Sequence, residues 1–188
     1  MTIEYELRTV LSEDEIEEVR LSLINLHARK IHDEARIERW ILKTRDSSLE
    51  KANNQWLRIR SNPDGDEMTL KSDAAPGEST EVSVKVSDAS SAVELLNRAG
   101  LPTERHQLTL REKWSLDEVV VTFDTWPLLG TIVEVESTLS LTRVHDVISE
   151  LGVPVDRFSD KGVVQLYDDV VGVDVLAISN LDFHTSVR

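Results

Sequence analysis

The sequence predicts an α+β fold in which eight antiparallel strands close into a β-barrel, a tunnel with a charged interior, flanked by about three amphipathic helices. Two observations carry this prediction. Predicted strands alternate charged with aliphatic residues, as in Trp56-Leu57-Arg58-Ile59-Arg60 and Ile132-Val133-Glu134-Val135-Glu136. Three other segments carry apolar residues at helical spacing, and such helices can cover the apolar outer face of a barrel whose charges point inward.

Eight segments read as strands because β-branched and aromatic residues alternate there with polar ones. They span residues 2–10, 36–46, 54–61, 66–72, 80–86, 105–115, 118–125 and 131–137. Successive side chains of a strand point to opposite faces, so Glu4, Glu6 and Arg8 share one face. Turn-forming residues cluster at 61–66 and 72–77, which predicts loops there.

Three helices follow from capping signals and apolar stripes. Two of them begin where a serine stands three residues before a glutamate, the spacing of a capping box, namely Ser12 with Glu15 and Ser91 with Glu94. The third places apolar residues on one face, Val144, Val147, Ile148 and Leu151. The last two helices end at glycines that a proline follows two residues later, Gly100 with Pro102 and Gly152 with Pro154.

The pairing of like charges is the unusual feature of these strands. A soluble sandwich would also alternate, with its charges in water. Here acids recur as Glu-x-Glu and bases as Arg-x-Arg or Arg-x-Lys, and like charges on one face repel each other. The paired acids therefore predict a bound metal ion, and the paired bases predict a bound anion. A divalent-metal polyphosphate matches both, since carboxylates bind hard cations and guanidinium groups bind phosphate oxygens.

The order of the motifs resembles the CYTH domain of the triphosphate tunnel metalloenzymes, which include class IV adenylate cyclases and thiamine triphosphatase-like proteins. The family's N-terminal Glu-x-Glu-x-Lys is similar to Glu4-Tyr5-Glu6-Leu7-Arg8. The resemblance continues through Leu57-Arg58-Ile59-Arg60, Thr69-Leu70-Lys71 and Arg111-Glu112-Lys113 to the segment from Asp124 to Glu136. It covers residues 2–167 in the same order.

The resemblance implies roles for the charged residues. The implied catalytic residues are Glu4, Glu6, Asp124 and Glu136. The implied ligands of a Mg²⁺ or Mn²⁺ cofactor are Glu4, Glu6, Asp124, Glu134 and Glu136. The implied substrate-binding residues are Arg8, Arg58, Arg60, Lys71, Lys85, Arg111 and Lys113, with Lys85 included because family members often carry an arginine ahead of the acid where this chain has Ser79 and Glu81.

The implied function is metal-dependent hydrolysis of a triphosphate-containing substrate, such as inorganic tripolyphosphate, thiamine triphosphate or a nucleoside triphosphate. The alternative is a class IV-type adenylate cyclase that forms cyclic AMP from ATP, and the second alternative is a non-catalytic polyphosphate-binding module. The chain departs from the family at Arg8, where the signature has lysine, at Ser79, and at Gly162-Val163, where a Ser-Tyr pair is common. The last two departures favour the non-catalytic module slightly.

The composition of the chain argues against several other classes of protein. The net charge of −14 argues against general nucleic-acid binding, which needs clustered basic residues. The absence of cysteine excludes a disulfide framework, and no apolar run reaches the roughly 20 residues of a membrane span. We expect a soluble, cytoplasmic protein whose partner is a small-molecule triphosphate, with no membrane contact, as a monomer or homodimer. We assign residues 1–170 to the tunnel domain and leave residues 171–188 as an unassigned C-terminal tail.

Overall fold

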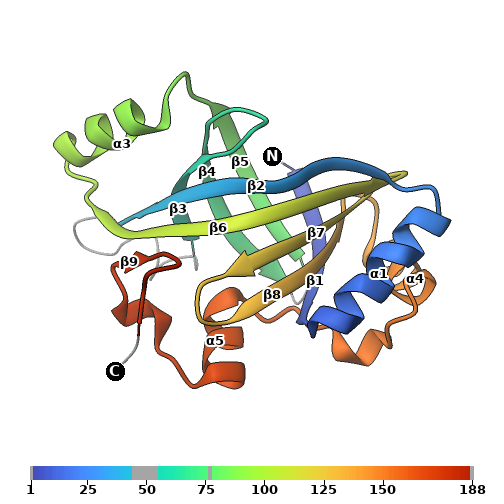
Figure 1. Cartoon of the computed structure of the whole chain (residues 1–188). Coiled ribbons are helices and arrows are strands. Elements are labelled where there is room, and N and C mark those ends of the chain that lie inside the picture. Colours follow the sequence, from blue (N-terminus) through green and yellow to red (C-terminus); the bar gives the residue numbers. More distant parts are fainter. Residues whose placement is uncertain (1, 44–54, 76–77, 187–188) are drawn as a thin grey trace.

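The computed structural model describes residues 2–43, 55–75 and 78–186. Eight long strands form a closed antiparallel ring (Figure 1) because β2 pairs with both β3 and β6, in the order β2-β3-β4-β5-β1-β8-β7-β6. These strands are β1 (Thr2–Val10), β2 (Arg29–Leu42), β3 (Gln55–Ser61), β4 (Glu67–Ala75), β5 (Glu78–Lys85), β6 (Thr103–Leu116), β7 (Val119–Trp126) and β8 (Gly130–Ser137). The ring confirms the predicted fold class.

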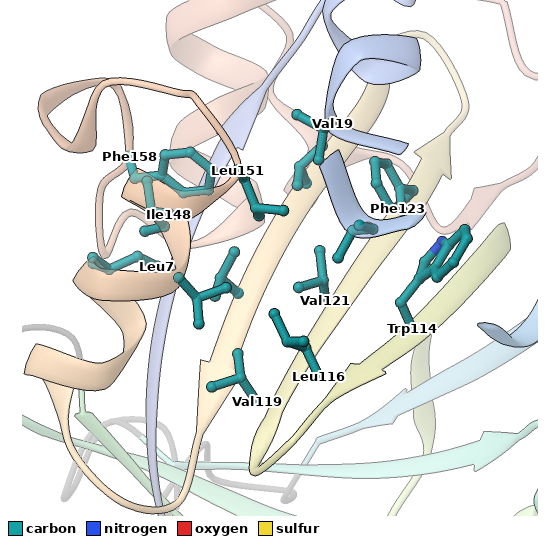
Figure 2. Close-up of a cluster of buried hydrophobic side chains, with 14 of the residues drawn as sticks. Leu7, Val19, Trp114, Leu116, Val119, Val121, Phe123, Ile148, Leu151 and Phe158 are labelled. Carbon is teal, nitrogen blue, oxygen red and sulfur yellow. The ribbon is translucent and has the colours of Figure 1, made fainter. Parts of the chain in front are cut away.

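The outer face of β1, β7 and β8 is apolar and packs under two helices, α1 (Glu13–Asn25) and α4 (Leu141–Glu150). Figure 2 shows this core, in which Ile148 of α4 and Leu151, the residue that caps α4, pack with Leu7 and Val121 of the strands. Val121 and Ile148 are completely buried. Burying one such side chain contributes about 1.5–3 kcal/mol, so the helices anchor these three strands of the ring.

The helix starts follow local capping chemistry. The predicted capping box of α1 is present, since the backbone N–H of Ser12 donates to Glu15 Oε2 over 2.9 Å and the Ser12 side chain accepts from the Glu15 backbone. The predicted start of the second helix is wrong. Helix α3 (Ala89–Arg98) begins after Asp88, whose carboxylate accepts the Ser91 N–H over 2.6 Å. Aspartate is as favourable as serine at the N-cap position, and Asp88 precedes Ser91 in the chain, so the helix begins after Asp88.

Helix α3 covers a second part of the barrel wall. Its Val93 packs with Leu42 of β2 and Ile59 of β3 in a separate apolar cluster. Strand β2 starts earlier than predicted, at Arg29 instead of residue 36, and its pairing with β6 shifts register between Lys30 and Ala35. Residues 44–46 and 54 of the predicted strands lie outside the described residues.

The C-terminal part of the chain forms elements that the sequence analysis did not assign. They are two 3₁₀ turns, η1 (Val155–Arg157) and η2 (Val175–Ala177), the helix α5 (Val163–Val171) and the short strand β9 (Asn180–Leu181), which pairs in parallel with β6. Helix α5 is capped at its C-terminal end by Gly172, which adopts a φ of +64° that favours glycine. The predicted boundary at residue 170 therefore lies inside a helix.

This C-terminal segment lies against one end of the ring (Figure 1). Its Tyr167 and Leu181, both completely buried, cluster with Trp126 and Ile132. Trp126 has the strand parity of Asp124, and Ile132 that of Glu134, so both side chains face the interior. The Tyr167 hydroxyl donates to the backbone oxygen of Pro127 over 2.5 Å. One end of the tunnel is thus bounded by apolar side chains. No helix among the described residues is long and apolar enough to cross a membrane.

Candidate functional site

Strand parity places the charged residues inside the ring. Val133 and Val135 of β8 are completely buried in the outer core, so Glu134 and Glu136 between them point inward. The register then brings Glu6 opposite Glu136. The same parity turns inward all the candidate residues of the sequence analysis, which are Glu4, Glu6, Arg8, Arg58, Arg60, Lys71, Lys85, Arg111, Lys113, Asp124, Glu134 and Glu136.

Three of the five predicted metal ligands form one cluster. Glu4, Glu6 and Glu136 each offer a carboxylate oxygen, and these oxygens lie within 4.8 Å of one another. Burial, followed by the charge of Glu81, raises the pKa of Glu4 to about 7. Burial, followed by the charges of Glu134 and Glu4, raises the pKa of Glu136 to about 7. Mutually repelling carboxylate oxygens are the donor set that a hard divalent cation prefers, so these residues fit Mg²⁺ or Mn²⁺.

Glu134 lies beside the cluster and makes an ion pair. Arg8 donates through Nε to Glu134 Oε2 over 2.7 Å, and Arg8 Nη2 lies 2.8 Å from Glu6 Oε1. Burial opposes the ionisation of Glu134, but the charges of Arg8 and Arg111 outweigh it and lower the pKa of Glu134 to about 2. Glu134 is therefore a permanent carboxylate that holds Arg8 next to the acidic cluster.

Asp124 lies among bases and apart from the three clustered acids. Arg111 binds both of its oxygens, with Nε 2.6 Å from Oδ1 and Nη2 2.5 Å from Oδ2. Arg39 donates through Nη2 to Oδ2 over 3.2 Å and through Nη1 to the Thr109 hydroxyl over 2.6 Å. The Arg39 guanidinium also stacks on the Trp126 ring at 5.1 Å. Asp124 thus fixes two guanidinium groups and has few lone pairs left for a metal.

Arg58 and Arg60 carry the strongest sign of a missing ligand. The Nε atoms of both side chains are buried and have no hydrogen-bond partner among the described residues. Among the described residues Arg58 pairs with Glu81, with Nη2 3.8 Å from Oε1, while Arg60 pairs with Glu67. Burial, followed by the charge of Arg60, lowers the pKa of Arg58. A buried N–H normally has an acceptor, so this pair of arginines is arranged to receive an anion.

The three predicted lysines differ in depth. Lys71 is buried and lies between Glu6, at 3.0 Å, and Glu81, at 3.2 Å. Burial disfavours its charge, but Glu6 and then Glu81 outweigh this and raise the pKa of Lys71. Lys113 and the exposed Lys85 lie at the opposite end of the ring from α5, where both contact Asp64 of the β3–β4 turn.

The predicted site residues do not include Arg39, Glu67, Glu81 and Thr122, which also lie inside the ring. Arg39, Glu67 and Glu81 all pair with predicted site residues, and Thr122 has a buried hydroxyl without a partner among the described residues. Parity could have placed Glu81, Glu67 and Thr122, since they alternate with Val82, Met68 and Val121. Arg39 directly follows another charged residue, Glu38, so charged and apolar residues do not alternate there. The sequence therefore does not indicate which face of the strand Arg39 occupies.

A family model decides the identity of this arrangement, because the CYTH domain matches residues 2–146. The chain belongs to the CYTH domain family. The match spans all eight strands of the ring and both halves of the acidic cluster. A search of curated proteins found no significant match.

Solved structures share the CYTH fold of this chain at low identity. A candidate adenylate cyclase from Vibrio parahaemolyticus is 14% identical with a TM-score of 0.77, over 89% of this chain and 98% of its own. The PH1012 protein from Pyrococcus horikoshii is 19% identical with a TM-score of 0.70, over 87% and 98%. A Hippeastrum candidate adenylyl cyclase, described as having a dominant triphosphatase activity, is 18% identical with a TM-score of 0.63, over 92% and 96%. At these identities the likeness shows the fold.

Proposed function

We propose that this CYTH protein is a metal-dependent hydrolase of triphosphate-containing substrates, which bind inside the tunnel. The observation that carries the proposal is the pair of buried arginines, Arg58 and Arg60, with Nε–H groups that lack acceptors. Leaving a buried donor unpaired costs about 1–3 kcal/mol, which a phosphate oxygen would recover. The same tunnel holds the Glu4, Glu6 and Glu136 cluster, so metal and polyphosphate would meet there.

Family membership supports the same reading. CYTH proteins are triphosphatases or adenylate cyclases, and the Hippeastrum protein of the same fold is described with triphosphatase activity. Both reactions require a bound triphosphate. Hydrolysis requires a site for the triphosphate and a water molecule, whereas the cyclase reaction also requires that the ribose of ATP be held in place. Hydrolysis is therefore the simpler proposal for a tunnel whose predicted site residues are all charged.

The residues of the tunnel would have different roles in the reaction. Glu4, Glu6 and Glu136 would hold a divalent cation, which supplies Lewis-acid polarisation of phosphoryl oxygens when bound. Since Glu4 and Glu136 have pKa values of about 7, they would release protons as the cation binds. Arg58 and Arg60 would pair with oxygens of the transferred phosphoryl group and stabilise the charge that develops there. Asp124 would keep Arg111 aimed at the same oxygens.

Adenylate cyclase activity is the second candidate, because the structure from Vibrio parahaemolyticus and one from Bacillus halodurans are described as candidate adenylate cyclases. In that reaction the ribose 3′-hydroxyl of ATP attacks the α-phosphorus and pyrophosphate leaves. The phosphate-binding residues would be the same, and the difference lies in which phosphorus atom they place in line with the nucleophile.

One experiment separates the candidates. The protein is incubated with tripolyphosphate and with ATP, each with Mg²⁺ or Mn²⁺, and both phosphate release and cyclic AMP are measured. We expect phosphate release that chelation of the metal abolishes. Cyclic AMP from ATP without phosphate release would favour the cyclase. Tight tripolyphosphate binding without either product would favour the non-catalytic module.

A further inference from the structure

The turn between β3 and β4, residues Asn62 to Gly65, has a fixed shape. The Asp64 N–H donates to the Asn62 side chain over 2.8 Å, and the Gly65 N–H donates to the Asn62 backbone oxygen over 3.0 Å. Gly65 has a φ of +108°, which other residues rarely adopt. This backbone leaves the Asp64 carboxylate free to point away from the turn and toward other strands.

Asp64 connects the turn to strands on both sides of it. Its carboxylate contacts His32 Nε2 of β2 at 2.9 Å and Lys113 Nζ of β6 at 3.3 Å. Its backbone oxygen accepts from Lys85 Nζ of β5 over 2.9 Å. Strand β2 lies between β3 and β6 in the ring, so the contact with Lys113 brings the turn past β2 at this end of the tunnel.

A small cavity lies beside the turn, and four basic side chains line it. Asp64 shares it with His32, Arg60, Arg111 and Lys113. Arg60 and Arg111 have other acidic partners, Glu67 and Asp124 respectively. Asp64 is the acid that Lys113 contacts within the described part of the chain. The turn therefore carries a single carboxylate to a place built for a more highly charged anion.

We propose that Asp64 is a built-in competitor of the substrate. Its carboxylate occupies the position at the tunnel mouth where an outer phosphate group of a polyphosphate pairs with Lys113 and His32. Binding of the polyphosphate displaces Asp64 and lifts the β3–β4 turn from the mouth. This inference rests on the polyphosphate binding proposed above and adds to it a residue that sets the apparent affinity.

The ion pair of Asp64 with Lys113 differs from that of Asp124 with Arg111, and the difference indicates that the Asp64 contact is exchangeable. Asp124 is buried and binds Arg111 with two hydrogen bonds, which makes it a permanent partner. The side chain of Asp64 is 48% exposed, and each of its oxygens makes one contact, Oδ1 with His32 at 2.9 Å and Oδ2 with Lys113 at 3.3 Å. Exposed single ion pairs are weak, whereas a polyphosphate brings several charges to the same bases. The exchange therefore favours the polyphosphate.

The test is the substitution Asp64→Asn, which keeps the size of the side chain and the backbone contacts of the turn. Calorimetric titration with tripolyphosphate should show binding roughly two- to fivefold tighter than in the wild type, since a weak competing ion pair has been removed. Asp33→Asn is the matched control. Asp33 is an exposed acid of β2 that pairs with Lys30, so this change removes one charge without touching Lys113, and the affinity should not change.

A double substitution shows whether Lys113 is a shared partner. In a Lys113→Ala background, Asp64→Asn should tighten binding less than it does in the wild type, because His32 is then the one shared partner left of the two contacts described above. The inference is overturned if Asp64→Asn binds tripolyphosphate with unchanged or weaker affinity, or if Asp33→Asn tightens it equally. Wild-type protein that binds tripolyphosphate normally while Asp64→Asn has no effect leaves the proposed function standing. A wild type that does not bind tripolyphosphate overturns both.

Discussion

Glu136 belongs to the candidate metal site, and its ionised carboxylate lowers the stability of the folded protein. Its carboxyl lies in the tunnel wall with other acids around it, and burial and those acids raise its pKa from the ordinary 4.5 to about 7. An acid whose folded pKa lies above its unfolded pKa binds more protons in the folded state. Its contribution to stability is therefore largest below pH 4.5 and is lost as the pH rises through 7.

This sign leads to a prediction for the metal-free protein. In chelator, Glu136→Gln should gain stability over the wild type as the pH rises from 5 to 8, by roughly 2 kcal/mol, because the amide cannot ionise. Urea unfolding at both pH values measures it. Glu150→Gln, which changes an exposed carboxylate that pairs with Arg143, should show no such trend. Stability curves of Glu136→Gln and wild type that stay parallel in pH would contradict the raised pKa.

The same substitution should destroy the activity. Replacing one carboxylate of the three-residue cluster by an amide weakens the hold on a divalent cation, so Mn²⁺-dependent phosphate release by Glu136→Gln should fall to background. Phosphate release is measured beside circular dichroism, which should show an unchanged fold. A folded, fully active Glu136→Gln protein would remove Glu136 from the metal site.

Arg58 gives the residue-scale prediction for the anion. Arg58→Ala should weaken tripolyphosphate binding about ten- to a hundredfold, since a charge-assisted hydrogen bond contributes about 1.5–3 kcal/mol. Arg98→Ala is the control, because Arg98 is an exposed arginine of α3 that pairs with Glu94 on the same helix. Calorimetric titration compares the two variants. Equal dissociation constants for Arg58→Ala and wild type would mean that Arg58 does not contact the polyphosphate.

At the scale of elements, the eight strands could be predicted because polar and apolar residues alternate over much of their length, and the start of β2, where this alternation is weak, was placed too late. Helix α5 could not, because Val163, Val164, Val170 and Val171 leave it without a clear polar face and Gly162 offers no capping side chain. The role of Asp124 was equally hidden. Arg39 and Arg111 reach it from two other strands, and this convergence depends on closing the ring.

Helix α5 can be tested through its one buried hydroxyl. Tyr167→Phe should destabilise the protein by about 1–3 kcal/mol, because the Pro127 backbone oxygen loses its donor in a buried place. Urea unfolding measures the change. Tyr5→Phe, at the chain's other tyrosine, is the matched control and should have little effect. A Tyr167→Phe protein as stable as the wild type would mean that α5 is held at the tunnel end by apolar packing alone.

At the scale of the whole molecule, the tunnel holds a cluster of three acids and a pair of buried arginines, whose like charges a metal and a polyphosphate would neutralise. Tripolyphosphate with metal should therefore raise the melting temperature, by roughly 5–10 °C at a concentration about 100 times the dissociation constant. Differential scanning fluorimetry measures the shift. Sodium chloride of equal ionic strength is the control and should give a much smaller shift. No shift with millimolar tripolyphosphate would count against the polyphosphate tunnel.

The C-terminal segment gives the tunnel two unlike ends. Trp126 and Ile132 form an apolar cluster with residues of α5 at one end, while Lys113 and Lys85 offer charge at the other. Anionic substrate and anionic product would then share a single route past Asp64. A phosphate product bound at this entrance would block the entry of the next substrate. We therefore expect turnover to slow as product accumulates, and added substrate should relieve this inhibition.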